Sequence, residues 1–267
     1  MEFLDCAQQC AQEAADAASK VLKKYWGKLK SVETKSAPSD LVTIADKESE
    51  EAIIRVIRSY FPDHAILGEE SGLEDRHHSP YQWIIDPLDG TTNYTHGYPM
   101  VAISIALYYQ MKPLVALVQN PLFNETFYAQ KNRGAYGNGK KLSVSKTHDL
   151  SSALLATGFA YDRLKTPETN YIEFAYFTQL TQGVRRLGAA ALDLAYVAAG
   201  RLDGYWERGL KPWDMAAGVL LIEEAGGKTS SYDTSPLDLS SGKILATNGR
   251  LHEAISAELM KLKRLTK

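Results

Sequence analysis

Residues 83–93 read Trp-Ile-Ile-Asp-Pro-Leu-Asp-Gly-Thr-Thr-Asn, and the expected fold is built outward from this stretch. Its apolar start predicts a buried strand, and two carboxylates follow where that strand ends. Pro87 has no N–H to donate to a sheet, so the strand ladder is expected to stop there. Gly90 lets a ligand approach the backbone closely, and Thr91–Asn93 can begin a helix whose free N–H groups suit a phosphate.

The spacing of Asp86 and Asp89 limits the kinds of phosphatase or metal site to which this motif can belong. On an extended strand this offset would place the two carboxylates on opposite faces, so they converge only if the chain turns at Pro87. Phosphatases of the haloacid dehalogenase class carry Asp-x-Asp-Gly-Thr, in which one residue separates the two acids, whereas two residues separate them here. An EF-hand needs Asp-x-[Asp/Asn]-x-[Asp/Asn]-Gly, which this spacing does not match either. Carboxylates beside a phosphate site would repel it unless magnesium ions lay between them. An Asx-turn with solvated acids would explain one Asp-Gly, but further acidic motifs accompany this one.

Three more acids are candidates for the same site. Glu69 lies in Gly-Glu-Glu-Ser-Gly at the end of a short strand, where a surface turn is the alternative. Asp214 lies in Lys-Pro-Trp-Asp, which fits the first turn of a helix, so capping alone would explain it. Asp46 follows Val-Thr-Ile-Ala and could equally be a helix cap. The residue patterns alone leave these alternatives open.

Composition points to an ordinary globular protein. The 267 residues suit one compact unit, with an α+β lobe at 1–148 and an α/β lobe at 149–267. A net charge of −2 gives no global attraction for nucleic acid or anionic lipid. The two cysteines, Cys6 and Cys10, suit neither a disulfide nor a metal site and indicate a reducing compartment, most simply the cytoplasm. We expect no signal peptide and no membrane span, because the longest apolar run, Val101–Tyr109, is too short.

Hydrophobic periodicity predicts two kinds of organisation. The first half is expected to carry helices at 3–26 and 53–60, and strands at 41–44, 65–67, 82–85, 101–109, 114–119 and 125–129 with an Asn-Gly hairpin at 137–139. The second half alternates, with strands at 153–158, 202–207 and 243–247 and helices at 167–181, 189–199, 213–225 and 251–265. The apolar face of the first helix is expected to contain Phe3, Cys10, Ala14, Ala17, Val21 and Tyr25.

Three acidic motifs follow one another along the chain: Gly-Glu-Glu-Ser at 68–71, the stretch at 83–93, and Trp-Asp-Met-Ala-Ala-Gly at 213–218. Taken together and in this order, they resemble the motifs of the inositol monophosphatase family. The likeness runs from the first helix to about residue 250, and the run Arg-Arg-Leu-Gly-Ala-Ala-Ala-Leu-Asp-Leu-Ala-Tyr at 185–196 is similar to bacterial inositol-1-monophosphatases. The resemblance implies a layered α-β-α-β-α sandwich of the sugar-phosphatase type, usually a homodimer. It also implies magnesium-dependent hydrolysis of small phosphate monoesters, most simply inositol 1-phosphate, and inhibition by lithium.

The resemblance further implies roles for individual residues. Two to three Mg²⁺ ions are expected: the first on Glu69, Asp86 and the Leu88 carbonyl, the second on Asp86, Asp89 and Asp214, and a weaker third assisted by Glu69. Thr91 and Asp46 match the pair that activates the attacking water, while the Gly90 and Thr91 N–H groups hold the phosphate. Lys35 matches a loop lysine near the site, and Ala190 and Glu207 match positions that contact substrate hydroxyls, beside Asp89 and Asp214.

Several alternatives stay open on these residues. The same metal carboxylates would serve a phosphatase of 3′-phosphoadenosine 5′-phosphate, fructose-1,6-bisphosphate or histidinol phosphate, and residues 150–210 would discriminate among them. A non-catalytic regulatory protein that keeps the fold should have lost a metal ligand or the water-activating pair, and neither is lost. Arg185 and Arg186 could serve substrate, a partner subunit or the surface.

Overall fold

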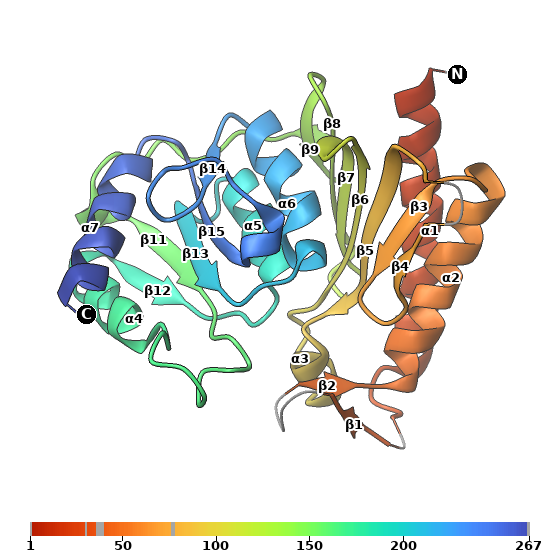
Figure 1. Ribbon diagram of the computed structural model, residues 1–267, viewed down its shortest axis with the longest axis horizontal. Helices are drawn as coiled ribbons and strands as arrows, with labels where there is room; N and C mark the ends of the chain where they lie inside the picture. The colour runs from red at the N-terminus through yellow and green to blue at the C-terminus, as the bar shows by residue number, and fades with distance from the viewer. Residues whose placement is uncertain (1, 30, 36–39, 76–77, 266–267) are drawn as a thin grey trace.

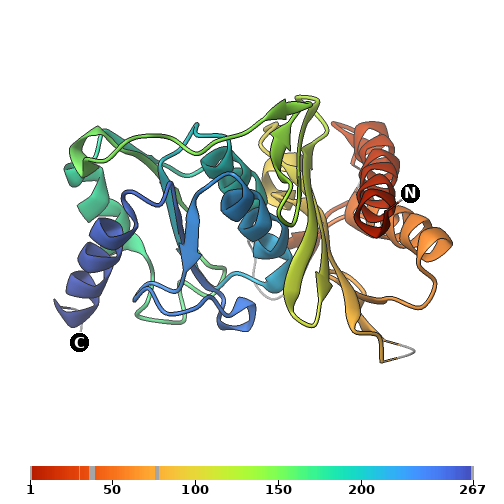
Figure 2. The ribbon, with the colours of Figure 1, turned by 90° about the horizontal axis from the view of Figure 1, so that it is seen from above.

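The computed structural model describes residues 2–29, 31–35, 40–75 and 78–265. The Ser, Pro and Asp residues of 35–40 predict a loop, and residues 36–39 of it lie outside the described ones. Helices and two large β-sheets alternate in five layers, in the order helix, sheet, helix, sheet, helix (Figures 1 and 2). This is the layered sandwich that the family resemblance implied. No helix in the described residues is long and apolar enough to cross a membrane.

The first sheet has eight strands in the order β10-β9-β8-β7-β6-β5-β3-β4. Neighbours are antiparallel except β3 and β5, which run parallel and therefore end at the same edge. The Asn-Gly hairpin is confirmed: Asn138 and Gly139 join β9 to β10 with φ of 46° and 77°. The strands are β3 (Ala65–Gly68), β4 (Gly72–Glu74), β5 (Tyr81–Asp89), β6 (Ala102–Tyr109), β7 (Lys112–Asn120), β8 (Glu125–Gln130), β9 (Gly134–Gly137) and β10 (Lys140–Lys141).

Helices α1 (Phe3–Tyr25) and α2 (Ile44–Tyr60) cover the outer face of this sheet (Figure 1). The prediction of the first helix is confirmed, but its expected buried face is only partly right, because Phe3 is 40% exposed. The buried stripe is made instead of small residues, which let α1 lie close to α2 and the sheet. Its members are the small residues Ala7, Cys10, Ala11, Ala14, Ala15, Ala18 and Ser19, together with the larger Leu22.

The second sheet has five strands in the order β12-β11-β13-β15-β14. Helices α5 (Ala190–Ala198) and α6 (Pro212–Glu224) lie between the two sheets, and α4 (Tyr171–Leu180) and α7 (His252–Leu265) lie outside (Figure 2). The strands are β11 (Leu154–Thr157), β12 (Gly183–Arg185), β13 (Gly204–Arg208), β14 (Lys228–Ser230) and β15 (Lys243–Thr247). The remaining elements are β1 (Glu33–Thr34), β2 (Leu41–Val42), α3 (Thr91–Thr95), η1 (Leu150–Ser152) and η2 (Leu239–Ser241).

Two expectations about strand ends are wrong. β5 does not stop at Pro87 but continues to Asp89, with its register against β6 shifted between Asp86 and Asp89. The missing N–H of Pro87 therefore produces a bulge in β5 and does not end the strand. The strand expected at 41–44 stops at Val42, because Thr43 caps α2 and the helix begins one residue later.

Helix α6 is buried on nearly all sides, as its apolar sequence requires for a helix between two sheets. Its contact with α5 is very close at Gly218, where a Cβ would lie 2.5 Å from the Cβ of Leu194. The central layer therefore depends on a missing side chain at this position.

We predict that Gly218→Ala destabilises the protein. Alanine in a helix interior is normally more favourable than glycine by about 1 kcal/mol, but overpacking a closed contact costs about 1–3 kcal/mol. The midpoint of urea unfolding should fall. Lys20→Ala, at an exposed position of α1, is the control and should leave the midpoint nearly unchanged. A midpoint raised by Gly218→Ala would contradict the close packing of α5 on α6.

Candidate active site

The bulge in β5 brings Asp86 and Asp89 to one end of the first sheet. The side chain of Asp86 is 1% exposed, and its Oδ1 accepts a hydrogen bond from the Leu88 N–H at 3.0 Å. Asp89 Oδ2 accepts from the N–H of Ala191 at 2.7 Å, in the first turn of α5. Asp89 thus ties the end of β5 to the helix layer between the sheets.

Glu69 and Asp214 meet these residues from two other directions. Glu69 follows β3, which ends beside β5 because the two strands are parallel. Asp214 lies in the first turn of α6, where its Oδ2 accepts from the N–H of Lys211 at 2.6 Å. The Asp86 carboxyl hydrogen-bonds to the side chains of both Glu69 and Asp214. Asp214 is therefore a helix cap and a member of the cluster, so the two readings of the sequence are compatible.

The negative charges of these four carboxyl groups are only partly balanced by positive charge nearby. Burial, with repulsion from the neighbouring acids, raises the pKa of Asp86 and Asp89 well above the usual range. Burial also raises the pKa of Glu69 to about 7 and that of Asp214 to about 6. Lys35 offsets part of the charge: its Nζ lies 2.9 Å from Glu69 Oε1 and 2.5 Å from a Glu70 oxygen. As expected, Lys35 lies at the site.

The donor set fits magnesium, although the described residues form no ready-made cage. No three Asp, Glu, His or Cys side chains among them are arranged to hold an ion as they stand, and Glu69 is engaged by Lys35. The expected ligands nonetheless line one cavity of about 330 Å³ and offer only oxygen donors, which Mg²⁺ prefers. Hydrogen bonds between carboxyl groups require protons, and a divalent cation would replace them. The lining includes Glu69, Asp86, Leu88, Asp89, Gly90, Thr91 and Asp214.

Asp46 and Thr91 form a buried pair beside this cavity. The Thr91 hydroxyl lies 3.0 Å from Asp46 Oδ1 and 3.1 Å from the Leu88 carbonyl oxygen, so one proton faces two acceptors. Asp46 Oδ2 accepts from the N–H and hydroxyl of Thr43 at 2.7 and 2.6 Å, which closes the capping box of α2. Burial raises the pKa of Asp46, while the hydrogen bonds from Thr43 and Thr91 oppose that shift. Asp46 is thus both a helix cap and a partner of Thr91.

Gly90 joins the bulge to α3 in a conformation that favours glycine. Its φ is 91°, and a Cβ would lie 2.9 Å from the Met100 carbonyl oxygen. Helix α3 begins at Thr91, as the sequence predicted.

A smaller cavity of about 90 Å³ adjoins the first and shares Asp89, Tyr161, Gly209 and Asp214 with it. Ala190 and Glu207, the expected substrate positions, both line it. The Tyr205 hydroxyl donates to Glu207 Oε2, and Gly158 packs so closely on this carboxylate that a Cβ would collide with it. Burial raises the pKa of Glu207 to about 7.

The comparisons with known proteins agree with this geometry. The family model described as "Inositol monophosphatase family" matches residues 4–264. The chain belongs to the inositol monophosphatase family. An inositol-1-monophosphatase of Synechocystis sp. is 53% identical over 251 residues, covering 94% of this chain and 88% of that protein. The structure of an inositol monophosphatase from Anabaena (Nostoc) sp. has a TM-score of 0.90 and 49% identity, covering 97% of each chain.

Members of the inositol monophosphatase family are phosphatases and in general depend on magnesium. Not every relative is named for that activity. The Pseudomonas aeruginosa protein "Nus factor SuhB" is 46% identical over 229 residues, covering 84% of each chain. Family membership therefore confirms the resemblance and leaves the substrate of this chain to be argued from its own residues.

Several residues that line the two cavities escaped the sequence analysis. Tyr161 lines both cavities, Lys211 lines the larger one and Asp193 lines the smaller one. Of these three, only Asp193 had a sequence signal, because it lies three residues after Ala190 on the same helix and so faces the same side. The sequence also left Arg185 and Arg186 undistinguished, and of the two only Arg186 lines the smaller cavity.

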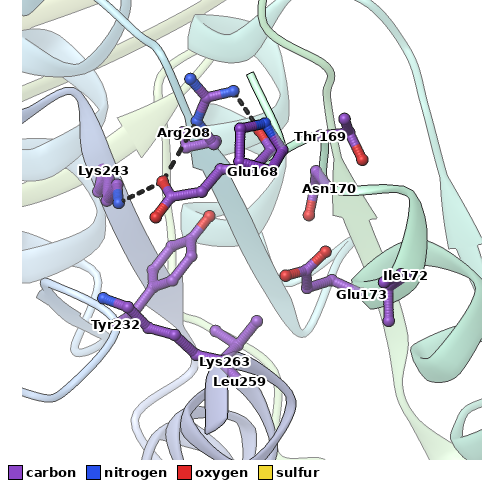
Figure 3. Close-up of a pocket in the computed structure, with 11 residues that line it drawn as sticks. Glu168, Thr169, Asn170, Ile172, Glu173, Arg208, Tyr232, Lys243, Leu259 and Lys263 are labelled. Atoms are coloured by element: carbon purple, nitrogen blue, oxygen red, sulfur yellow. Dashed lines mark hydrogen bonds and ion pairs between the residues drawn. The ribbon is translucent and has the colours of Figure 1, made fainter. Parts of the chain in front are cut away.

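A third cavity, of about 210 Å³, lies on the opposite face of β13 (Figure 3). Successive residues of a strand point to opposite faces, so Glu207 faces the smaller cavity of the site and Arg208 faces this one. Glu168 bridges the charges there, 2.7 Å from Lys243 Nζ and 3.8 Å from Arg208 Nε. No residue that the sequence predicted for the site lines this cavity.

We predict that magnesium stabilises the protein more at pH 8 than at pH 6. Carboxyl groups with raised pKa values favour the folded state at low pH, and this contribution is lost as pH rises through about 6 for Asp214 and about 7 for Glu69. A cation that replaces these protons restores the lost stability above that range. The thermal midpoint, measured with Mg²⁺ and with chelator at both pH values, checks this.

Asp86→Asn should greatly reduce the magnesium-induced shift, because it removes one charge from the centre of the cluster without changing its volume. Asp149→Asn, at a side chain that is 64% exposed, is the matched control and should keep the full shift. An undiminished shift in Asp86→Asn would show that the ion binds elsewhere.

Proposed function

We propose that this protein hydrolyses inositol 1-phosphate to inositol and phosphate with two to three Mg²⁺ ions. The observation that carries the proposal is the convergence of Glu69, Asp86, Asp89 and Asp214 on one cavity beside the Asp46–Thr91 pair. When bound, magnesium would lower the pKa of a water molecule and neutralise phosphate charge. The proposed ligands are Glu69, Asp86, the Leu88 carbonyl, Asp89 and Asp214, and occupancy of the Asp89–Asp214 side by lithium would inhibit.

The chain's own residues would orient the phosphate and move the proton. The N–H groups of Gly90 and Thr91, at the start of α3, would hold phosphate oxygens. The attacking water would donate its proton to Thr91 Oγ1 as that hydroxyl passes its own to Asp46 Oδ1. We propose direct in-line attack without a phospho-enzyme, because no cysteine lines the cavity in the described residues and its aspartates other than Asp40 are the proposed metal ligands.

Thr91→Ala and Asp46→Asn should each lower kcat by roughly 10²–10⁴, the usual contribution of positioned acid–base groups. Because the two act as one unit, the double variant should be little slower than the worse single variant. Steady-state kinetics on the four proteins checks this. Multiplicative losses in the double variant would show that Thr91 and Asp46 act independently.

Glu207 argues for a hydroxyl-rich monophosphate over a substrate with a second phosphate. Its carboxylate lines the smaller cavity and is 8% exposed, so it can accept hydrogen bonds from ring hydroxyls and would repel another anion. Ala189 and Ala190 leave room there for a compact ring. Histidinol phosphate, 3′-phosphoadenosine 5′-phosphate and fructose-1,6-bisphosphate are the alternatives from the same chemistry.

Glu207→Gln should raise KM for inositol 1-phosphate more than KM for p-nitrophenyl phosphate, because the nitrophenyl ring has no hydroxyl groups that could hydrogen-bond to Glu207. Phosphate release from a panel of inositol, sugar and nucleotide phosphates, with magnesium and with chelator, measures both. Much faster hydrolysis of 3′-phosphoadenosine 5′-phosphate than of inositol 1-phosphate by the unchanged protein would refute the substrate assignment. It would leave the metal chemistry standing.

We further propose a cytoplasmic homodimer that acts on a small phosphorylated polyol without a membrane or nucleic-acid partner. The free Cys6 and Cys10 support the compartment. A regulatory role without catalysis is the other candidate, and the name of the Pseudomonas aeruginosa relative is its support. Phosphate release by the purified protein that is lost in Asp86→Asn would decide for catalysis.

A further inference from the structure

The smaller cavity contains a second acid that the proposed function has not used. Asp193, in the first turn of α5, is 1% exposed and lines this cavity together with Glu207. Its Oδ1 is fully buried and has no hydrogen-bond partner within the described residues. A buried acceptor without a donor lowers the stability of the folded state, so such groups normally receive a hydrogen bond from protein, water or ligand.

The other buried aspartate among the described residues of this half has its hydrogen bonds supplied by the protein. Asp203, which is 7% exposed, accepts from the Ser145 hydroxyl at 2.5 Å and from the Leu154 N–H at 2.6 Å. Asp203 lines neither cavity of the site. Of the two buried aspartates of this half, Asp193 alone has an oxygen without a partner in the described residues, and Asp193 alone lines a cavity of the site.

The charges around the cavity limit what can supply the missing donor. Arg186 lies at its wall, exposed to solvent, with its guanidinium against Gly188. One exposed cation faces two buried carboxylates, Asp193 and Glu207, so a second phosphate would meet net repulsion. Neutral hydroxyl groups satisfy both acids without adding charge.

We propose that Asp193 is a specificity-determining residue that, with Glu207, accepts hydrogen bonds from two hydroxyl groups of the substrate alcohol. The inference rests on the proposed function and deepens it. The preferred substrate class is a compact polyol monophosphate with at least two free hydroxyls turned away from the ester. An alcohol with a single hydroxyl to offer would leave one buried carboxylate unpaired and bind less well.

The test is the ratio of kcat/KM for inositol 1-phosphate to kcat/KM for p-nitrophenyl phosphate, measured on one enzyme sample. The ratio cancels any loss of folded protein, which guards against a variant that folds poorly. Asp193→Leu keeps the branched shape, with a somewhat larger volume, but removes both acceptor oxygens, and it should lower the ratio by about tenfold or more. Asp193→Asn keeps one acceptor oxygen and should retain most of the ratio. Asp203→Asn is the matched control and should leave the ratio unchanged.

The outcomes separate this inference from the function on which it rests. If the unchanged protein prefers inositol 1-phosphate and Asp193→Leu keeps the same ratio, the role of Asp193 is overturned and the function stands. If Asp193→Asn loses as much as Asp193→Leu, the residue acts by its charge and not as an acceptor, which also overturns the proposal. If the unchanged protein shows no preference for inositol 1-phosphate, the proposed function falls and this inference falls with it.

Discussion

The interaction on which the site depends is mutual repulsion among carboxylates held at one point of the fold. Asp86 and Asp89 come from β5, Glu69 from the neighbouring strand end and Asp214 from the first turn of α6. Isolated in water, such acids would stay apart and ionised. The fold holds them together at the cost of raised pKa values, with Lys35 as partial compensation. An arrangement so unfavourable for the protein alone is suited to divalent cations, and the proposed chemistry follows from that mismatch.

Local stabilisation helps to maintain this unfavourable cluster. Asp46 and Asp214 each close the capping box of the helix that presents them, so their orientation is set by backbone N–H groups of Thr43 and Lys211. Asp89 is likewise held by the N–H of Ala191. Each of these three carboxylates uses one oxygen to hold its place, while the residue still lines or borders the cavity. The hydrogen bonds that hold these carboxylates at the helix starts therefore also fix the geometry of the site.

The layered architecture gives the two sides of the site different tasks. The first sheet and α6 present the acids, and α2 and α3 present Asp46 and Thr91. In contrast, β13 and α5 present Glu207 and Asp193. Close helix packing at Gly218 keeps α5 and α6 together between the sheets. Successive side chains of β13 point to opposite faces, which separates Glu207 from the charged cavity around Arg208. The charged residues that line one cavity therefore do not line the other.

Much of this protein is determined by sequence alone. The acidic motifs, the Asn-Gly hairpin, most helices and the family itself can be recognised there, because periodicity, turn chemistry and motif order are local properties of the chain. The bulge at Pro87, the small-residue face of α1 and the early start of α2 could not be predicted, because backbone register and burial depend on neighbours distant in sequence.

The site shows the same division. Sequence named the carboxylates and Thr91 but could not choose between a helix cap and a place in the site for Asp46 and Asp214. Tertiary contacts show that each caps its helix and also lies in or beside the cavity. Only the tertiary structure separated Arg186 from Arg185 and exposed the orphan oxygen of Asp193. An unpaired buried atom is defined by what does not surround it, and only the packed structure determines those surroundings.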